Sequence, residues 1–247
     1  MRDLEFAYPD GTKVLQGVTA LVTHGESVAV VGANGAGKST LLLLLSGCLL
    51  PTAGEIRIGD VPLSAGTVAT IRRSVGMVFQ HADDQLFMPT VLEDAAFGPL
   101  NQGLPAAEVR AAALRSLEAV DGAHLKDRPP YRLSYGEKRI AAIGAVLACS
   151  PDVLLMDEPS ADLDPVHRRK LIGLLGTFAH TKIIATHDLD LALDVCGRTV
   201  VLHDGRVAAD GPTATLLADR GLLAANGLDL PLRLQGCPVC GGSGSAD

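Results

Sequence analysis

The sequence predicts an α/β protein built around a parallel sheet, and two observations lead to this fold class. Three short apolar runs, at residues 27–31, 153–156 and 183–185, have the texture of strands that are covered on both faces. The composition agrees, because 47% of the residues are hydrophobic while only 3% are aromatic. A chain of 247 residues is long enough to bury one such core with a smaller subdomain attached.

The N-terminal third is expected to contribute strands and one helix. Residues 2–7 alternate apolar and polar side chains, as a half-buried strand does, and a tight turn follows at 9–11. The run at 27–31 leads into a glycine-rich turn and then into an apolar stretch at 41–50, which we interpret as a buried helix. Residues 75–79 are expected to form another short strand.

The middle of the chain differs in texture and predicts a helical insertion between two strands of the sheet. Prolines interrupt residues 81–150, and the stretch 106–120 has helical spacing. Its candidate buried face carries Val109, Leu114 and Leu117.

Two hairpins are expected outside this insertion. One spans residues 55–63 and turns at Gly59-Asp60, and the other spans 199–208 and turns at Asp204-Gly205, a dipeptide typical of short hairpins. Beyond residue 211 we expect a short helix, an irregular segment and a tail rich in Gly and Ser.

The domain organisation follows from these elements. We expect one nucleotide-binding domain at 1–215, made of a core at 1–80 and 151–215 and the helical insertion at about 81–150. Residues 216–247 would form a short C-terminal extension that ends in a flexible tail with a Cys-x-x-Cys pair.

Charge and hydropathy restrict the partners of the chain. The formal net charge of −7 argues against a general grip on nucleic acid, which needs Lys and Arg against the phosphates. No signal-peptide pattern opens the sequence, and the apolar stretch at 41–50 is too short to cross a bilayer. We therefore expect an intracellular protein that reaches a membrane only through partners.

The strongest chemical signal is the glycine-rich turn after the strand at 27–31, which fits G-x-x-x-x-G-K-[ST] between a strand and a helix. Glycines let successive backbone N–H groups point into one concavity, where the helix N-terminus adds positive potential. Lys38 would reach the β- and γ-phosphates, and the Ser39 hydroxyl would bind Mg²⁺. The residues expected to bind nucleotide here are Gly32, Ala33, Asn34, Gly35, Ala36, Gly37, Lys38, Ser39 and Thr40.

A second signal is the acidic end of the run at 153–156. Asp157 emerges where ligands bind, beyond the carboxyl end of a parallel strand, and is placed to hold the Mg²⁺ shell. Glu158, one residue on, is the natural group to polarise an attacking water. Two acids also follow strands that merely meet solvent, but the Lys38 loop in the same chain favours the catalytic interpretation.

Five further motifs lie in order along the chain, one before and four after the glycine-rich loop, and together with it they resemble those of ABC-type ATPases. They are the adenine-stacking Tyr8, the Q-loop Gln80, the signature at 133–137, the D-loop at 160–164 and the switch His187. The joint order is far more specific than any single motif. The resemblance implies an α/β P-loop NTPase (RecA-like) core with an antiparallel β subdomain and an inserted α-helical ABC subdomain.

The same resemblance implies an ATPase that uses ATP and Mg²⁺ and acts as a head-to-tail dimer with a second copy or a close paralogue. Lys38 would lie on one side of the nucleotide, and Ser134, Gly136 and Glu137 of the other subunit would approach from the opposite side. The helix that begins near Gly136 would aim its N-terminus at the γ-phosphate.

The remaining roles also come from the resemblance. Glu158 would polarise the attacking water, His187 would contact the γ-phosphate, and Asp164 would help couple the two sites across the interface. The implied Mg²⁺ ligands are Ser39, Gln80 and Asp157.

The signature departs from the family pattern Leu-Ser-Gly-Gly-Gln at two positions, because Tyr135 replaces a glycine and Glu137 replaces the glutamine. One interpretation is tolerated variation with altered turnover. The other is a partly degenerate composite site that an active partner ATPase complements.

The Q-loop region at 78–99 resembles that of the energy-coupling-factor ATPases, which drive uptake of vitamins and of cobalt or nickel. In ABC proteins generally this region docks the integral membrane subunit, which the resemblance places here near residues 80–99, and the substrate-binding membrane subunit would be reached indirectly. The favoured apolar contacts are Leu86, Phe87, Phe97 and Pro99. The alternative contacts are the acids Asp83, Asp84, Glu93 and Asp94.

The function expected from these resemblances is an importer ATPase on the cytoplasmic face of the cell membrane. The compact chain favours cobalt or nickel as cargo, and vitamin import is the alternative. A non-transport ABC ATPase in DNA repair or translation is a further alternative, although this chain has neither a second cassette nor a long coiled-coil insertion. Glu158 argues against a binder that does not hydrolyse ATP.

The cysteines allow two interpretations. Cys48, Cys149 and Cys196 lie in apolar segments and are expected to be buried and reduced. Cys237 and Cys240 form only half of a four-cysteine zinc set, which two tails of a dimer could complete. We favour a mobile tail with incidental cysteines.

Overall fold

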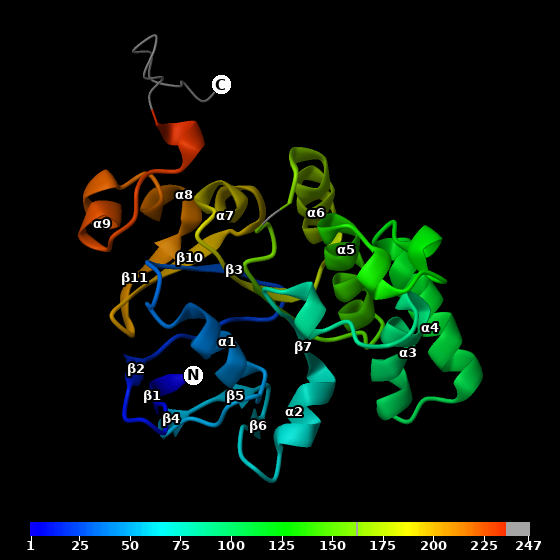
Figure 1. Cartoon of the computed structure of the whole chain (residues 1–247). Helices are drawn as coiled ribbons and strands as arrows, with labels where there is room; N and C mark the ends of the chain where they lie inside the picture. The colour runs from blue at the N-terminus through cyan, green and yellow to red at the C-terminus, as the bar shows by residue number, and fades with distance from the viewer. Residues whose placement is uncertain (162, 236–247) are drawn as a thin grey trace.

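The computed structural model describes residues 1–161 and 163–235. In these residues the centre is a six-stranded sheet with the order β11-β10-β3-β9-β8-β7 (Figure 1). All neighbouring pairs are parallel except β10 and β11. The strands are β3 (Ser27–Val31), β7 (Val75–Val78), β8 (Val153–Asp157), β9 (Thr181–Ala185), β10 (Arg198–His203) and β11 (Arg206–Pro212). The predicted parallel α/β sheet is confirmed.

Alternate residues of the central strands feed two hydrophobic cores on opposite faces of the sheet. Val28 and Val30 of β3 pack into one core, while Ala29 and Val31 pack into the other. The first core also takes side chains of α1 (Lys38–Leu45) and the second those of α6 (Pro165–Thr177) and α7 (Leu189–Val195). Burial on both faces explains why these strands are continuous apolar runs.

The register places the carboxyl ends of the parallel strands at one edge of the sheet. Val30 pairs with Ala185, and Ala185 pairs with Asp157. Val78 of β7 pairs with Met156, so its end lies at the same level. The loops that follow these strands therefore open into one crevice.

A small antiparallel sheet with the order β2-β1-β4 lies beside the first core (Figure 1). Its strands are β1 (Arg2–Ala7), β2 (Lys13–Val18) and β4 (Ala53–Glu55), followed by the hairpin of β5 (Arg57–Ile58) and β6 (Val61–Pro62). The prediction of β1 and of the hairpin is confirmed. The sequence analysis missed β2, β4 and helix α2 (Val68–Ser74).

The apolar stretch at 41–50 is helical only in its first half, so its predicted end is wrong. Helix α1 ends at Leu45, and Gly47 takes a φ of +70° that reverses the chain. A glycine adopts this left-handed conformation without the steric cost that other residues bear.

Between β7 and β8 lie three longer helices that share a third core. They are α3 (Val91–Asn101), α4 (Ala106–Ala119) and α5 (Tyr135–Leu147), accompanied by the short 3₁₀ turns η1 (Ala82–Asp84), η2 (Ala123–Leu125) and η3 (Pro130–Arg132). The predicted face of α4 is confirmed at Val109 and Leu117, which are buried, while Leu114 is half-buried.

The C-terminal part begins with the predicted hairpin of β10 and β11. Asp204 and Gly205 both have positive φ, at +45° and +72°, as the two-residue turn requires. Then follow α8 (Thr213–Leu216), α9 (Arg220–Ala225) and the 3₁₀ turn η4 (Leu232–Leu234). The tail with Cys237 and Cys240 lies outside the described residues.

The three cysteines that lie in apolar segments differ in their exposure. Cys196 is buried as expected and Cys149 is half-buried, but Cys48 is exposed because the chain has already left α1. No helix in residues 1–161 and 163–235 is long and apolar enough to cross a membrane.

Candidate functional site

The loop between β3 and α1 is shaped by glycines that other residues could not replace. A Cβ on Gly32 would lie 2.3 Å from the carbonyl oxygen of Leu202. Gly37 has a φ of +102°, and a Cβ there would lie 2.7 Å from the Leu15 side chain. At both positions a Cβ would overlap neighbouring atoms, so glycine is what lets the loop pass this close to them.

Lys38 lies inside this loop and is 7% exposed. Its Nζ donates to the carbonyl oxygens of Gly32 at 2.8 Å and Ala33 at 3.2 Å. Burial lowers the pKa of Lys38, and the nearby Glu158 and Asp157 carboxylates oppose that change. The ammonium group is therefore held by weak acceptors that a phosphate can replace.

Asp157 at the end of β8 is 6% exposed. Its Oδ1 has no hydrogen-bond partner in the described part of the chain, and its carboxyl group is hydrogen-bonded to Ser39. Burial raises the pKa of Asp157, so that a cation would be needed to stabilise its charge. A free buried carboxylate oxygen beside a hydroxyl fits Mg²⁺, which binds through few protein ligands plus water and phosphate oxygens.

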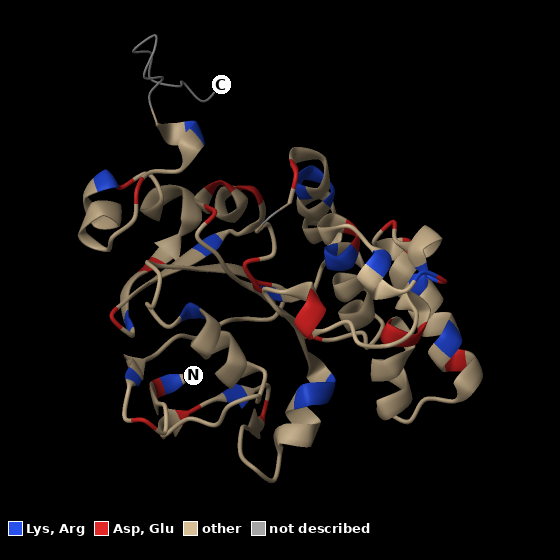
Figure 2. Cartoon of the chain, viewed as in Figure 1, with Lys and Arg blue, Asp and Glu red and all other residues tan. Residues whose placement is uncertain are grey.

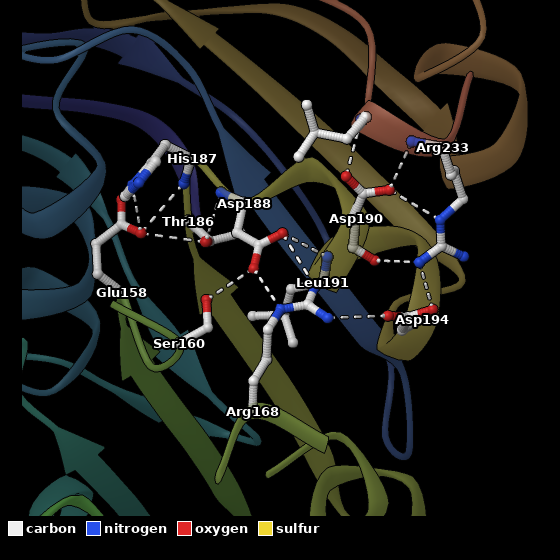
Figure 3. A network of polar contacts seen from close by, with 11 residues as sticks. Glu158, Ser160, Arg168, Thr186, His187, Asp188, Asp190, Leu191, Asp194 and Arg233 are labelled. Carbon is white, nitrogen blue, oxygen red and sulfur yellow. Dashed lines mark hydrogen bonds and ion pairs between the residues drawn. The ribbon is translucent and has the colours of Figure 1, made fainter. Parts of the chain in front are cut away.

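Glu158 and His187 form a compact pair in the crevice (Figure 3). The Glu158 Oε2 atom accepts from the Thr186 hydroxyl and from the His187 backbone N–H, both at 3.1 Å. The same oxygen lies 2.8 Å from Nδ1 of His187. Glu158 has a φ of +44°, a strained conformation of the kind found at functional sites, and its own N–H donates to Ala185 at 2.8 Å.

Tyr8 lies against the first turn of α1, and Gln80 lies in the loop after β7. The Tyr8 hydroxyl is 3.3 Å from the Thr40 hydroxyl, and its ring packs edge-on against Phe6, with 37% of the residue exposed. Gln80 follows β7 and is exposed, and its backbone carbonyl accepts from Arg139. The structure thus brings Tyr8 to the glycine-rich loop by direct contact.

The predicted signature begins α5 and caps it. Ser134 Oγ accepts from the Glu137 N–H at 3.3 Å, and Glu137 Oε2 accepts from the Ser134 N–H at 2.7 Å. Arg128 pairs with the other Glu137 oxygen at 2.7 Å. The hydrogen bond from the Ser134 N–H holds the pKa of Glu137 below its usual range although burial opposes it. Glu137 therefore forms a capping box that fixes the start of the helix.

Gly136 and Asp164 have roles within the chain that the sequence analysis did not identify. A Cβ on Gly136 would lie 2.8 Å from the ring of His167, so only glycine allows α5 to approach α6 this closely. Asp164 caps α6 by accepting from the N–H groups of Val166 at 2.8 Å and His167 at 3.0 Å, and it also contacts the His167 ring.

Tyr135, the first residue of α5, contacts the Q-loop and Arg139. Its hydroxyl lies 3.4 Å from both the Gln80 carbonyl oxygen and Arg139. Arg139 is 1% exposed, and its guanidinium donates to the carbonyl oxygens of Phe79 and Gln80. A buried arginine thus ties α5 to the Q-loop, and no sequence signal singled it out.

The sequence analysis missed three more polar residues near His187, namely Thr186, Asp188 and Arg168. Thr186 bridges Glu158 and Asp188, and Asp188 accepts from Ser160 at 3.0 Å and from Arg168 (Figure 3). The Asp directly after His187 fits the helix-cap preference, which was the available signal. Residue 162, in the centre of the predicted D-loop, lies outside the described residues.

Comparison with known proteins shows that the chain is similar to ABC transporter ATP-binding proteins. Residues 15–161 match the family model described as "ABC transporter". A Geobacter sulfurreducens protein named as an ABC transporter ATP-binding protein is 60% identical over 98% of this chain and 97% of its own length. The energy-coupling-factor transporter ATP-binding protein EcfA of Methanocaldococcus jannaschii is 43% identical over 93% of this chain and 84% of its own length.

Solved structures show the same fold. The chain of cbiO1 from Clostridium perfringens, part of the transporter complex cbiONQ, has a TM-score of 0.80 at 37% identity, covering 91% of this chain and 92% of that one. A dimeric ATP-binding cassette with bound ADP and phosphate has a TM-score of 0.77 at 28% identity, covering 86% of this chain and 97% of that one.

Proposed function

Since this chain belongs to the ABC transporter family of ATP-binding proteins and is an ATPase, we propose that it hydrolyses ATP with the groups gathered at the carboxyl ends of β3, β8 and β9. The observation that carries this assignment is the Glu158 carboxylate, buried in the crevice with one oxygen shared between Thr186 and His187. Lys38 lies close enough for the Glu158 charge to affect its pKa.

Phosphate binding would use groups that are already in place. Lys38 would exchange the Gly32 and Ala33 carbonyl oxygens for phosphate oxygens, which bind an ammonium group more strongly. Ser39 and the free Oδ1 of Asp157 would hold Mg²⁺, with the predicted ligand Gln80 completing the protein contribution. When bound, Mg²⁺ neutralises charge that develops on the transferred phosphoryl group.

Glu158 would accept the proton of the attacking water while His187 contacts the γ-phosphate. In a head-to-tail dimer, Ser134 and the N-terminus of α5 would approach from the second subunit, a copy or a close paralogue. Ser134 is exposed, and its hydroxyl oxygen accepts a bond within the cap, so that its own hydrogen is available to a phosphate. Glu137 is occupied by the cap and would act through it.

Replacement of Glu158 by Gln tests this assignment. We expect ATP turnover to fall at least about 100-fold while ATP binding persists, because the base is lost and the phosphate cradle is intact. Size-exclusion chromatography with ATP and Mg²⁺ should then show a trapped dimer. Glu118→Gln, at an exposed acid on α4, is the matched control. Full turnover of Glu158→Gln would assign the base elsewhere.

We also propose that the surface around α3 docks an integral membrane subunit. Phe87 and Phe97 pack edge to face at 4.9 Å and are 63% and 38% exposed. They line a hollow of about 230 Å³ that also contains Arg72 and Arg73. Leu86 is buried, so it supports this surface from beneath. Pro99 is buried within α3 as well.

The acids near this surface have separate tasks. Asp94 is buried, accepts from the N–H groups of Phe87 and Met88 at 3.0 Å each, and so holds the loop that displays Phe87. Asp83 forms an ion pair with Lys138. These contacts favour the aromatic side chains as the docking anchors.

Combined replacement of Phe87 and Phe97 by Ala tests the docking proposal. We expect the variant to bind ATP normally but to lose most of its co-purification with the membrane subunit, because buried aromatic anchors dominate such interfaces. Tyr131→Ala, at another exposed aromatic residue, is the control. Equal recovery of the membrane subunit with both variants would place docking elsewhere.

The cargo that we propose is cobalt or nickel, moved inward by a transporter whose ATPase lies on the cytoplasmic face of the membrane. Support comes from the likeness to cbiO1 and to EcfA proteins. Vitamin import is the alternative. Uptake of Co²⁺, Ni²⁺ or vitamins by vesicles that contain the whole transporter distinguishes them, and association of the chain with ribosomes or DNA instead would contradict transport.

A further inference from the structure

The C-terminal segment, residues 226–235 after α9, is bound to α7 by hydrogen bonds and ion pairs. The backbone N–H groups of Leu232 and Arg233 donate to the Asp190 carboxylate at 2.8 and 3.3 Å. The Arg233 guanidinium pairs with Asp190 at 2.8 Å and with Asp194 at 2.6 Å, and it also donates to the Asp190 carbonyl oxygen at 3.2 Å. Arg233 therefore neutralises two acids that lie one turn apart on the same helix.

A second arginine approaches α7 from the opposite side. Arg168 of α6 donates to both oxygens of Asp188 at 3.0 and 3.2 Å, and its Nη1 lies 3.8 Å from Asp194. Figure 2 shows acidic positions on α7 between basic positions on α6 and on the C-terminal segment. In this cluster two guanidinium groups serve three carboxylates, so that the acids compete for them.

Asp188 connects this cluster to the proposed catalytic pair. Its carboxylate accepts from the Ser160 hydroxyl at 3.0 Å and from the Leu191 N–H at 2.8 Å, so it caps α7 and holds the D-loop. Its own N–H donates to the Thr186 hydroxyl at 3.0 Å, which in turn donates to Glu158 at 3.1 Å. Polar contacts thus run without a gap from Glu158 through Asp188, Arg168 and Asp194 to Arg233 (Figure 3).

We propose that Arg233 is a positioning residue for the switch histidine. Because Arg233 neutralises Asp190 and Asp194, Arg168 remains paired with Asp188. Asp188 in turn holds the backbone of residues 186–188 against Glu158. Without Arg233, Arg168 alone would face three carboxylates, and Asp194 is already within 3.8 Å of it. The inference rests on the proposed roles of Glu158 and His187.

Steady-state kinetics of the full chain test the proposal. Arg233→Ala is expected to lower kcat roughly 3- to 10-fold with the KM for ATP unchanged, since the phosphate loop is not touched and only the switch is displaced. The control is Arg220→Ala on α9, for which the described residues show no ion pair. A kcat of Arg233→Ala equal to that of the control would overturn the proposal.

A second substitution separates positioning from simple anchoring of the segment. Asp194→Asn added to Arg233→Ala removes the carboxylate that would draw Arg168 away, and kcat is expected to recover to within about twofold of the original. An anchoring role predicts no recovery, because Asp194→Asn restores none of the contacts that Arg233 made to α7. Lack of recovery would therefore also overturn the proposal.

Hydrogen exchange supplies a readout that does not depend on turnover. In Arg233→Ala, the amides of His187, Asp188 and Leu191 should exchange at least about fivefold faster than in the unaltered chain, because their acceptors are loosened. Unchanged exchange there contradicts the positioning proposal alone. Normal turnover of Glu158→Gln contradicts the proposed function, and with it the kinetic part of this inference, whatever the exchange rates show.

Discussion

The two halves of the nucleotide site come from one chain but are built differently. Lys38 follows β3, while Asp157 and Glu158 lie at the end of β8. Strand β9 lies between these two strands, and backbone ladders fix the register of all three. The signature half begins α5 in the helical segment, where a capping box, the buried Arg139 and one close helix crossing hold it. The sheet half is therefore fixed by backbone hydrogen bonds, whereas the signature half depends on individual side-chain contacts and one helix crossing.

The largest expected effect belongs to the sheet half. Lys38→Ala should weaken ATP binding at least about 100-fold, or about 2.7 kcal/mol, because no other described cation lies inside the glycine-rich loop. Calorimetric titration with ATP measures this change. Lys170→Ala, which removes an exposed pair with Asp121, is the control. Equal affinities would show that the loop binds phosphate through backbone alone.

The next largest effect is expected at Arg139, which connects α5 of the signature half to the loop after β7. Arg139→Ala would leave the carbonyl oxygens of Phe79 and Gln80 without their buried donor, and we expect a loss of about 3 kcal/mol in the free energy of unfolding. Urea denaturation measures it, with the exposed Arg132→Ala as control. A loss below about 1 kcal/mol would mean that water replaces the guanidinium at low cost.

A smaller effect is expected at the crossing of α5 and α6. Gly136→Ala should cost about 1 to 3 kcal/mol in unfolding free energy, because the new methyl group overlaps the His167 ring. Gly173→Ala on α6 is the matched control, since nothing lies within 4 Å of its Cβ and Ala favours a helix by up to about 1 kcal/mol. Thermal unfolding of both variants should thus shift in opposite directions, and a shared direction would contradict the packing argument.

The smallest effect concerns the departure from the family signature. Within the described residues, the Tyr135 hydroxyl makes only long contacts of 3.4 Å, so Tyr135→Gly should change ATP turnover by no more than about twofold. Tyr135→Phe, which removes the hydroxyl alone, should leave turnover equally unchanged. A large gain of turnover in Tyr135→Gly would favour the degenerate-site interpretation instead.

Much of the fold followed from local texture. The buried strands at β3, β8 and β9 were predicted because burial on both faces leaves a continuous apolar run. Strand β2 was missed because Gly17 and a register shift interrupt its alternation. Helix α1 was predicted too long because apolar residues continue past the turn at Gly47.

The candidate site divides in the same way. Lys38, Asp157 and Glu158 could be predicted as site residues because the pattern that points to them is carried by neighbouring residues in the chain. Arg139 and Arg233 could not be recognised, since their partners lie 59 or 60 and 39 to 43 positions away and depend on the packing of helices. Ser134 and Glu137 show an intermediate case, because the three-residue spacing of a capping box was visible but was assigned only to the signature.

The shared register of the parallel strands limits where residues can be inserted into or deleted from the chain. Asp157 pairs with Ala185, and Met156 pairs with Val78. Deleting or inserting one residue inside β8 would exchange the faces of every following side chain and carry Asp157 and Glu158 out of the crevice. The turn between α3 and α4, around Gly103, has no such register to keep. Tolerance to insertions and deletions should therefore be concentrated there and be absent from β8.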